Sequence, residues 1–99
     1  MVNELFVEKS KVLTKIVNKK AEILTLKHLI GLKETELLLN TDFKELGLTN
    51  EKQRTAYLND QLRSQKEELD WLKYDLNVLE NDLDMTNTLI KGDLNGIEK

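Results

Sequence analysis

The sequence predicts an all-α protein, an antiparallel helical hairpin whose two long helices pair as a coiled coil. Three observations predict it: two aliphatic ladders that step alternately by four and three residues, a turn-forming segment between them, and opposite charge on the two halves. The composition agrees, because 33% of the 99 residues are charged, 5% are aromatic and none is proline. A hydrophobic content of 39% argues against disorder. One domain over residues 1–99 is expected.

The clearer ladder lies in the C-terminal half and predicts a helix over residues 50–91. Its repeat of about 3.5 residues keeps one narrow stripe facing a partner helix. Asn50 and Gln53 form a candidate capping box at the start, and Gly92 is the expected C-terminal stop, with a frayed tail over 92–99. Eight of its ten positions are aliphatic; they are Leu58, Leu62, Gln65, Leu69, Leu72, Leu76, Leu79, Leu83, Thr86 and Ile90.

The N-terminal half carries the same step and predicts a helix over residues 3–40. Lysine at such a seam can extend its ammonium outward while its stem covers the partner helix. Gly31 weakens the helix, so it either permits a close backbone approach or marks a bend. Seven of the ten ladder positions are aliphatic; they are Leu5, Lys9, Val12, Ile16, Lys19, Ile23, Leu26, Ile30, Lys33 and Leu37.

Residues 41–49 separate the two ladders and predict a short helical turn followed by a loop. Thr41 or Asp42 would start the turn, Gly47 would stop it, and Thr49 would cap the next helix. If the chain reverses here, residues whose numbers sum to about 95 face each other across the seam. This register places Ile16 opposite Leu79 and Val12 opposite Leu83, both aliphatic pairs.

Charge supports the antiparallel arrangement. Residues 9–33 contain seven lysines and one acid, whereas residues 62–86 contain seven acids and three bases. The two arms therefore attract each other when antiparallel. Because exposed ion pairs contribute little free energy, this attraction selects the orientation more than it stabilises the fold.

A second apolar stripe runs along each helix, outside the ladders. One interpretation is that two hairpins pack into a dimeric four-helix bundle, or that one hairpin curls to bury these residues in a single broad core. The other is a groove or ridge that receives a partner protein, with Trp71 and Tyr74 as aromatic anchors. The stripe residues are Tyr57, Trp71, Tyr74, Val78, Met85 and Leu89 in the second helix, and Phe6, Leu13, Val17, Leu24 and Leu38 in the first.

Cysteine and histidine, which many catalytic and metal sites need, are sparse. Cysteine is absent, and His28, the one histidine, has no metal ligand or catalytic partner at helical spacing. The four glycines occur singly, so no phosphate-binding loop is present. We therefore expect no enzyme, no catalytic residue, no metal and no cofactor. Leu37 to Leu39 form the longest aliphatic run, so neither a membrane span nor a secretion signal is expected.

A nucleic-acid interface has weak support. Lys11 and Lys15 should lie outside the seam, but only Phe6 is near them as a stacking platform, and the acidic arm opposite would neutralise much of their field. Pairing within the chain is the simpler explanation for the lysine-rich stretch.

The stretch from Leu37 to Leu62 resembles a run in small uncharacterised helical proteins of bacteriophages that infect Gram-positive bacteria. Similarity elsewhere is limited to coiled-coil character. The resemblance brings no catalytic residues and implies a phage protein that acts in the bacterial cytoplasm, encoded near replication and recombination functions. Its core residues here are Thr41, Asp42, Phe43, Lys44, Leu46, Gly47, Leu48, Thr49, Asn50, Glu51, Lys52, Arg54, Ala56 and Tyr57.

These observations together predict a non-enzymatic coiled-coil protein that associates with itself, as a homodimer, and binds a host or phage protein. It would assist phage replication or recombination, or inhibit a host defence system. The alternatives are a nucleic-acid accessory factor and a virion assembly protein or tail chaperone. Candidate partner-binding residues are Trp71, Tyr74 and Tyr57, together with the polar tip residues Asp42, Lys44, Lys52, Gln53 and Arg54.

Overall fold

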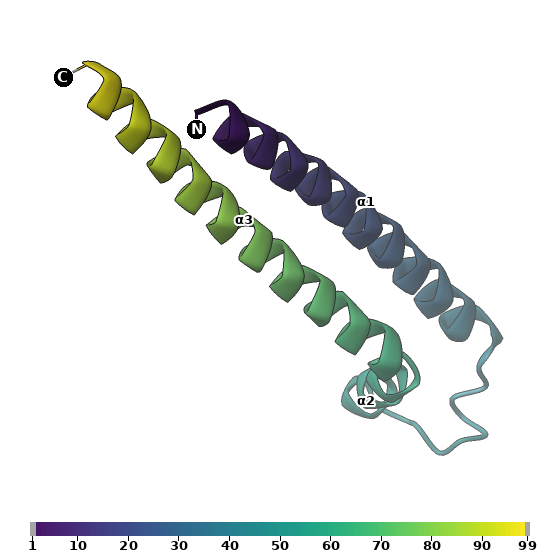
Figure 1. Ribbon diagram of the computed structural model, residues 1–99. Coiled ribbons are helices and arrows are strands. Elements are labelled where there is room, and N and C mark those ends of the chain that lie inside the picture. The colour runs from purple at the N-terminus through teal and green to yellow at the C-terminus, as the bar shows by residue number, and fades with distance from the viewer. Residues whose placement is uncertain (1, 99) are drawn as a thin grey trace. The chain divides into compact units, whose positions relative to one another are not determined.

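The computed structural model describes residues 2–98, which form three α-helices and no strand. Helix α1 spans Val2–Asn40, α2 spans Glu51–Gln61 and α3 spans Arg63–Glu98 (Figure 1). The all-α fold class predicted from the sequence is confirmed. Within the described residues, no helix is both long and apolar enough to span a bilayer.

The helices form two compact units. The first combines Met1–Glu22 with Leu72–Lys99, and the second comprises Ile23–Trp71. In the first unit, the start of α1 and the end of α3 lie at the same end, so the two segments are antiparallel (Figure 1). Here Lys19 Nζ of α1 lies 3.9 Å from Asp75 Oδ2 of α3. The two residue numbers sum to 94, which agrees with the predicted register.

The predicted ladders form the buried seam of both units. All twenty ladder positions are buried or half-buried, whereas most other positions on the long helices are exposed. In the first unit, Val12, Ile16 and Ile90 are 5 to 7% exposed. In the second unit, Leu62 is fully buried and Ile30 is 8% exposed. The 3.5-residue spacing therefore identified the packed face of each helix. Burial of apolar side chains on this face is the main force that stabilises the packing.

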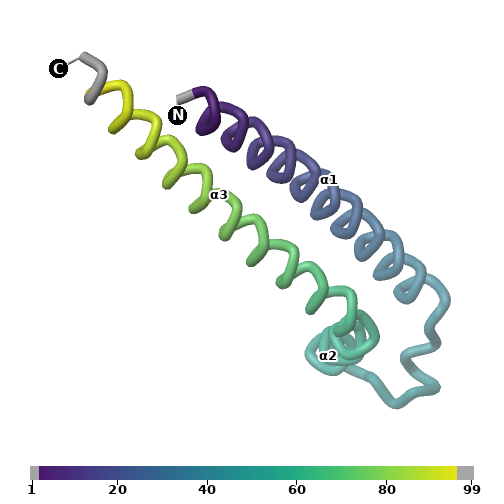
Figure 2. Tube along the Cα trace, viewed as in Figure 1, coloured from purple at the N-terminus to yellow at the C-terminus, as the bar shows by residue number. Residues whose placement is uncertain are grey.

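The segment between α1 and α2 folds as the predicted turn and loop (Figure 2). Asp42 starts the turn, because its Oδ1 accepts a hydrogen bond from the Glu45 N–H at 3.1 Å. Gly47 ends it with a φ of 75°, a left-handed conformation that L side chains disfavour. The Leu48 N–H then donates to the Phe43 carbonyl at 2.8 Å, which satisfies a carbonyl that the short turn leaves open.

Asn50 and Gln53 cap the start of α2, as predicted, but Gln53 bonds the N–H of Thr49 rather than that of Asn50. The Gln53 N–H donates to Asn50 Oδ1 at 2.8 Å, so Asn50 is the N-cap. The Gln53 side chain reaches back, and its Oε1 accepts from the Thr49 N–H at 2.9 Å. Thr49, which was expected as a cap, therefore contributes its backbone rather than its hydroxyl.

The predicted continuous helix over residues 50–91 is wrong in one respect, because the chain bends at Leu62. Its φ of −101° and ψ of 4° end α2, and α3 begins at the next residue. Figure 2 shows α2 almost end-on beside the first turn of α3, so the direction of the chain changes sharply. No proline or glycine lies at this bend; what distinguishes Leu62 is its complete burial. Lys66 Nζ donates to Asn59 Oδ1 at 2.7 Å and spans the bend.

The predicted C-terminal stop is also wrong. Helix α3 continues through Gly92 to Glu98, so residues 92–98 are helical rather than frayed, and Lys99 lies outside the described residues. A single glycine costs a helix only about 1 kcal/mol, and α3 continues through it. Helix α1 likewise runs without interruption through Gly31, where a Cβ would meet nothing within 4 Å. A close backbone approach therefore does not explain Gly31.

Candidate interaction surfaces

The tip of the second unit is closed by an aromatic and cationic cluster. The rings of Phe43 and Tyr57 meet edge to face, with centroids 6.1 Å apart. The Arg54 guanidinium lies 5.8 Å from the centroid of the Phe43 ring, and its Nε donates to the Leu48 carbonyl at 3.2 Å. Such contacts each contribute about 0.5 to 1.5 kcal/mol. The sequence contains these two aromatic residues and the arginine, but their contact was not predictable from it, because the contact requires α2 to fold against the turn.

These contacts change how the predicted tip residues are interpreted. Asp42 and Gln53 use their side chains to cap helical turns, and Arg54 and Tyr57 pack against Phe43. All four therefore have a role in the fold, whatever they bind. The remaining two candidates, Lys44 and Lys52, are exposed.

The second stripe of α3 is exposed. Trp71 is 68% exposed and Tyr74, one helical turn later, is 59% exposed. Val78, Met85 and Leu89 are 41%, 65% and 53% exposed. Tyr57 was assigned to the same stripe, but it lies in α2, before the bend, and is half-buried beside Phe43.

The second stripe of α1 is exposed as well. Its exposure excludes the alternative that one hairpin curls to bury both stripes in a single core. Sequence reasoning missed three further exposed leucines of α1, Leu29, Leu32 and Leu39. The predicted residues in this stripe are Phe6, Leu13, Val17, Leu24 and Leu38, with exposures from 41% to 68%.

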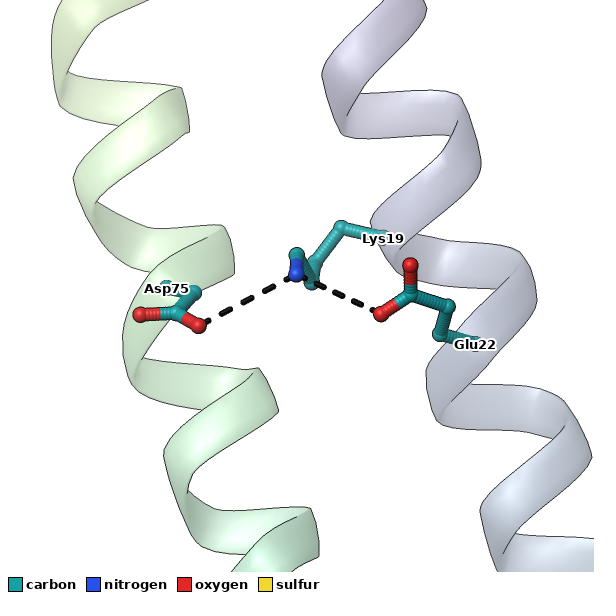
Figure 3. Close-up of polar contacts among 3 residues, drawn as sticks. All are labelled: Lys19, Glu22 and Asp75. Atoms are coloured by element: carbon teal, nitrogen blue, oxygen red, sulfur yellow. Dashed lines mark hydrogen bonds and ion pairs between the residues drawn. The ribbon is translucent and has the colours of Figure 1, made fainter.

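A surface hollow in the first unit lies between α1 and α3. Lys19 Nζ lies between two acids there, 3.3 Å from Glu22 Oε2 and 3.9 Å from Asp75 Oδ2 (Figure 3). Lys15, one of the two nucleic-acid candidates, lines this hollow together with the same acids, which weakens its attraction for a polyanion. Lys11 is exposed. The lining residues are Lys15, Asn18, Lys19, Glu22, Asp75, Val78 and Leu79.

Within residues 2–98, no group of three histidine, cysteine, aspartate or glutamate side chains is placed to hold a metal ion. His28 is exposed on α1. Comparison of the chain with models of protein families, with curated proteins and with solved structures finds no match. The exposed surfaces described above are therefore the basis for a functional inference.

Proposed function

We propose that this chain is a non-enzymatic coiled-coil protein of a phage, which associates with itself and binds another protein in the cytoplasm of the infected bacterium. There it assists phage replication or recombination, or inhibits a host defence system. The phage assignment depends on the resemblance in residues 37–62. The binding mode depends on the geometry of the helices.

The observation that carries the proposal is the exposed stripe of α3. All ladder positions are buried or half-buried without it, so Trp71 and Tyr74 are not needed to fill the seam. Large aromatic side chains exposed on a rigid helix are typical anchors of protein–protein interfaces, because they bury much area at low conformational entropy cost. At the tip, Lys44 and Lys52 are the candidates that the fold does not use as caps.

Affinity capture from the lysate of a phage-infected Gram-positive host tests the proposal. The tagged intact chain is compared with one variant that combines Trp71→Ala and Tyr74→Ala, and another that combines Lys44→Ala and Lys52→Ala. Asn87→Ala with Asn95→Ala is the matched control, because both asparagines are exposed on α3 and lie off the stripe. Gln53 and Arg54 are left unchanged, since their loss would disturb the tip itself.

With one of the two test variants, the captured amount of one partner protein is expected to fall at least tenfold. The intact chain and the control should retain that protein, as measured by quantitative mass spectrometry. If both variants retain the same proteins as the intact chain, the proposed surfaces are wrong. Loss of a partner only with the Lys44 and Lys52 variant would assign binding to the tip rather than to α3.

A further inference from the structure

The first unit has two exposed apolar stripes of equal length. On α1 the stripe consists of Phe6, Leu13 and Val17, which are 47%, 41% and 65% exposed. On α3 it consists of Val78, Met85 and Leu89, which are 41%, 65% and 53% exposed. Each stripe spans eleven residue steps of its helix. The two surfaces can therefore cover each other along their whole lengths.

The two stripes lie on opposite sides of the unit. Val78 lines the hollow together with Lys15 and Asn18, so the α3 stripe lies on the side of the hollow. Leu13 and Val17 are each two residues from Lys15, and two residues correspond to about 200° around a helix. The α1 stripe therefore lies on the side away from the hollow. One flat interface cannot cover both stripes of the same copy.

Charge favours contact between unlike helices. Residues 9–21 of α1 contain five lysines and no acid, whereas residues 74–90 of α3 contain four acids and no base. Two α1 stripes in contact would bring lysines together, and two α3 stripes would bring acids together. Only α1 against α3 repeats the attraction that joins Lys19 to Asp75 within one chain.

We infer that the first unit binds a second copy of this chain, with the α1 stripe of one copy against the α3 stripe of the next. The inference rests on the self-association in the proposed function and specifies its geometry. Because the stripes lie on opposite sides, two copies cannot cover both stripes of each other, and a further copy can add at the free stripe on either side of the pair. A dimeric four-helix bundle, the arrangement expected from the sequence, would instead need both helices to present their third apolar position to the same side.

Two complementary variants test this geometry in the purified chain. The first combines Leu13→Ser with Val17→Ser and lacks the α1 stripe; the second combines Val78→Ser with Met85→Ser and lacks the α3 stripe. The control combines Asn87→Ser with Asn95→Ser, which are both exposed on α3 and lie off the stripe, since Asn87 is two residues, or about 200°, from Met85 and from Leu89. Sedimentation equilibrium over a hundredfold range of concentration gives the mass of each protein and of the mixed variants.

The intact chain and the control are expected to exceed twice the monomer mass as concentration rises. Each variant alone should remain at the monomer mass, and an equimolar mixture should reach twice that mass and no more, because one intact stripe of each kind remains. Any of three results would overturn the inference. These are a variant that dimerises alone, an intact chain that stops at one or two copies, and a mixture that stays monomeric.

Circular dichroism shows whether the variants keep their helices. If a double variant loses helix, the single substitutions Val17→Asn and Met85→Asn replace it, since both side chains are 65% exposed. Neither pair includes Trp71, Tyr74, Lys44 or Lys52. Failure of this assembly therefore leaves the capture of a partner protein to be decided by its own experiment.

Discussion

Lys19 of α1 and Asp75 of α3 form an ion pair across the seam of the first unit, with 3.9 Å between Nζ and Oδ2 (Figure 3). Lys19 occupies a ladder position and is 22% exposed at its side chain, whereas the Asp75 side chain is 51% exposed. The lysine stem thus covers the seam while its ammonium reaches an acid at the edge. The pair joins the basic and the acidic arm in the predicted register.

The free energy of this pair can be measured with a double-mutant cycle. Lys19→Ala and Asp75→Ala, alone and combined, should give a coupling energy of about 0.5 kcal/mol in urea unfolding at low salt, because the pair is partly solvated. The coupling should shrink in 1 M NaCl. The same cycle with the exposed Lys20 in place of Lys19 is the control and should give a coupling near zero. Equal coupling in both cycles would contradict the specific contact.

Leu62 should be the most sensitive apolar position at the bend. Its side chain is completely buried, so Leu62→Ala removes apolar area and leaves a cavity that should lower the free energy of unfolding by about 2 to 5 kcal/mol. Leu39→Ala is the control, because Leu39 is 78% exposed, and it should cost less than about 0.5 kcal/mol. Similar losses for both would show that Leu62 is not packed as described.

Glycine-to-alanine substitutions should have opposite effects at two positions. Gly31→Ala should raise the free energy of unfolding by about 1 kcal/mol, because alanine is the better helix former and its Cβ meets nothing. Gly47→Ala should lower it by about 1 kcal/mol, since the φ of 75° is costly for a residue with a Cβ. Thermal unfolding followed by circular dichroism measures both. Destabilisation by Gly31→Ala would indicate a role for this glycine that the packing does not show.

Gln65 is a polar residue in the ladder that the fold leaves unsatisfied. Within residues 2–98, its buried Oε1 has no hydrogen-bond partner. Gln65→Leu should therefore raise the free energy of unfolding by about 1 kcal/mol. Thr86→Val is the comparison, because the Thr86 hydroxyl already donates to the Asp82 carbonyl at 2.9 Å, and a smaller gain is expected there. No gain at Gln65 would mean that its amide is satisfied in solution.

The buried face of each helix was predictable from the sequence because the 3.5-residue period is a property of the residues alone. The caps were predictable for a similar reason: Asp42, Gly47 and Asn50 act on backbone within a few residues of themselves. The two exposed stripes were also found, since their residues repeat at a helical position that the seam does not use.

The bend at Leu62 was not predictable, because no helix breaker marks it. Leu62 fits the ladder equally well in one continuous helix and in two helices that meet at a bend. Gly92 misled the prediction, since one glycine costs a helix only about 1 kcal/mol and α3 continues through it. The contact between Arg54 and Phe43 depends on the angle between α2 and the turn, which residue spacing does not contain. Which side of the unit each stripe faces likewise became clear only from the hollow beside Val78.

The antiparallel register of the two ladders is the central claim, and engineered cysteines measure it directly, because the chain has no cysteine of its own. Val12→Cys with Leu83→Cys is expected to form a disulfide within one chain under mild oxidation of a dilute sample, as seen on a non-reducing gel. Val12→Cys with Leu72→Cys, moved eleven residues along α3, should form none. Equal or faster closure of the second pair, or disulfides that form only between chains, would contradict the account.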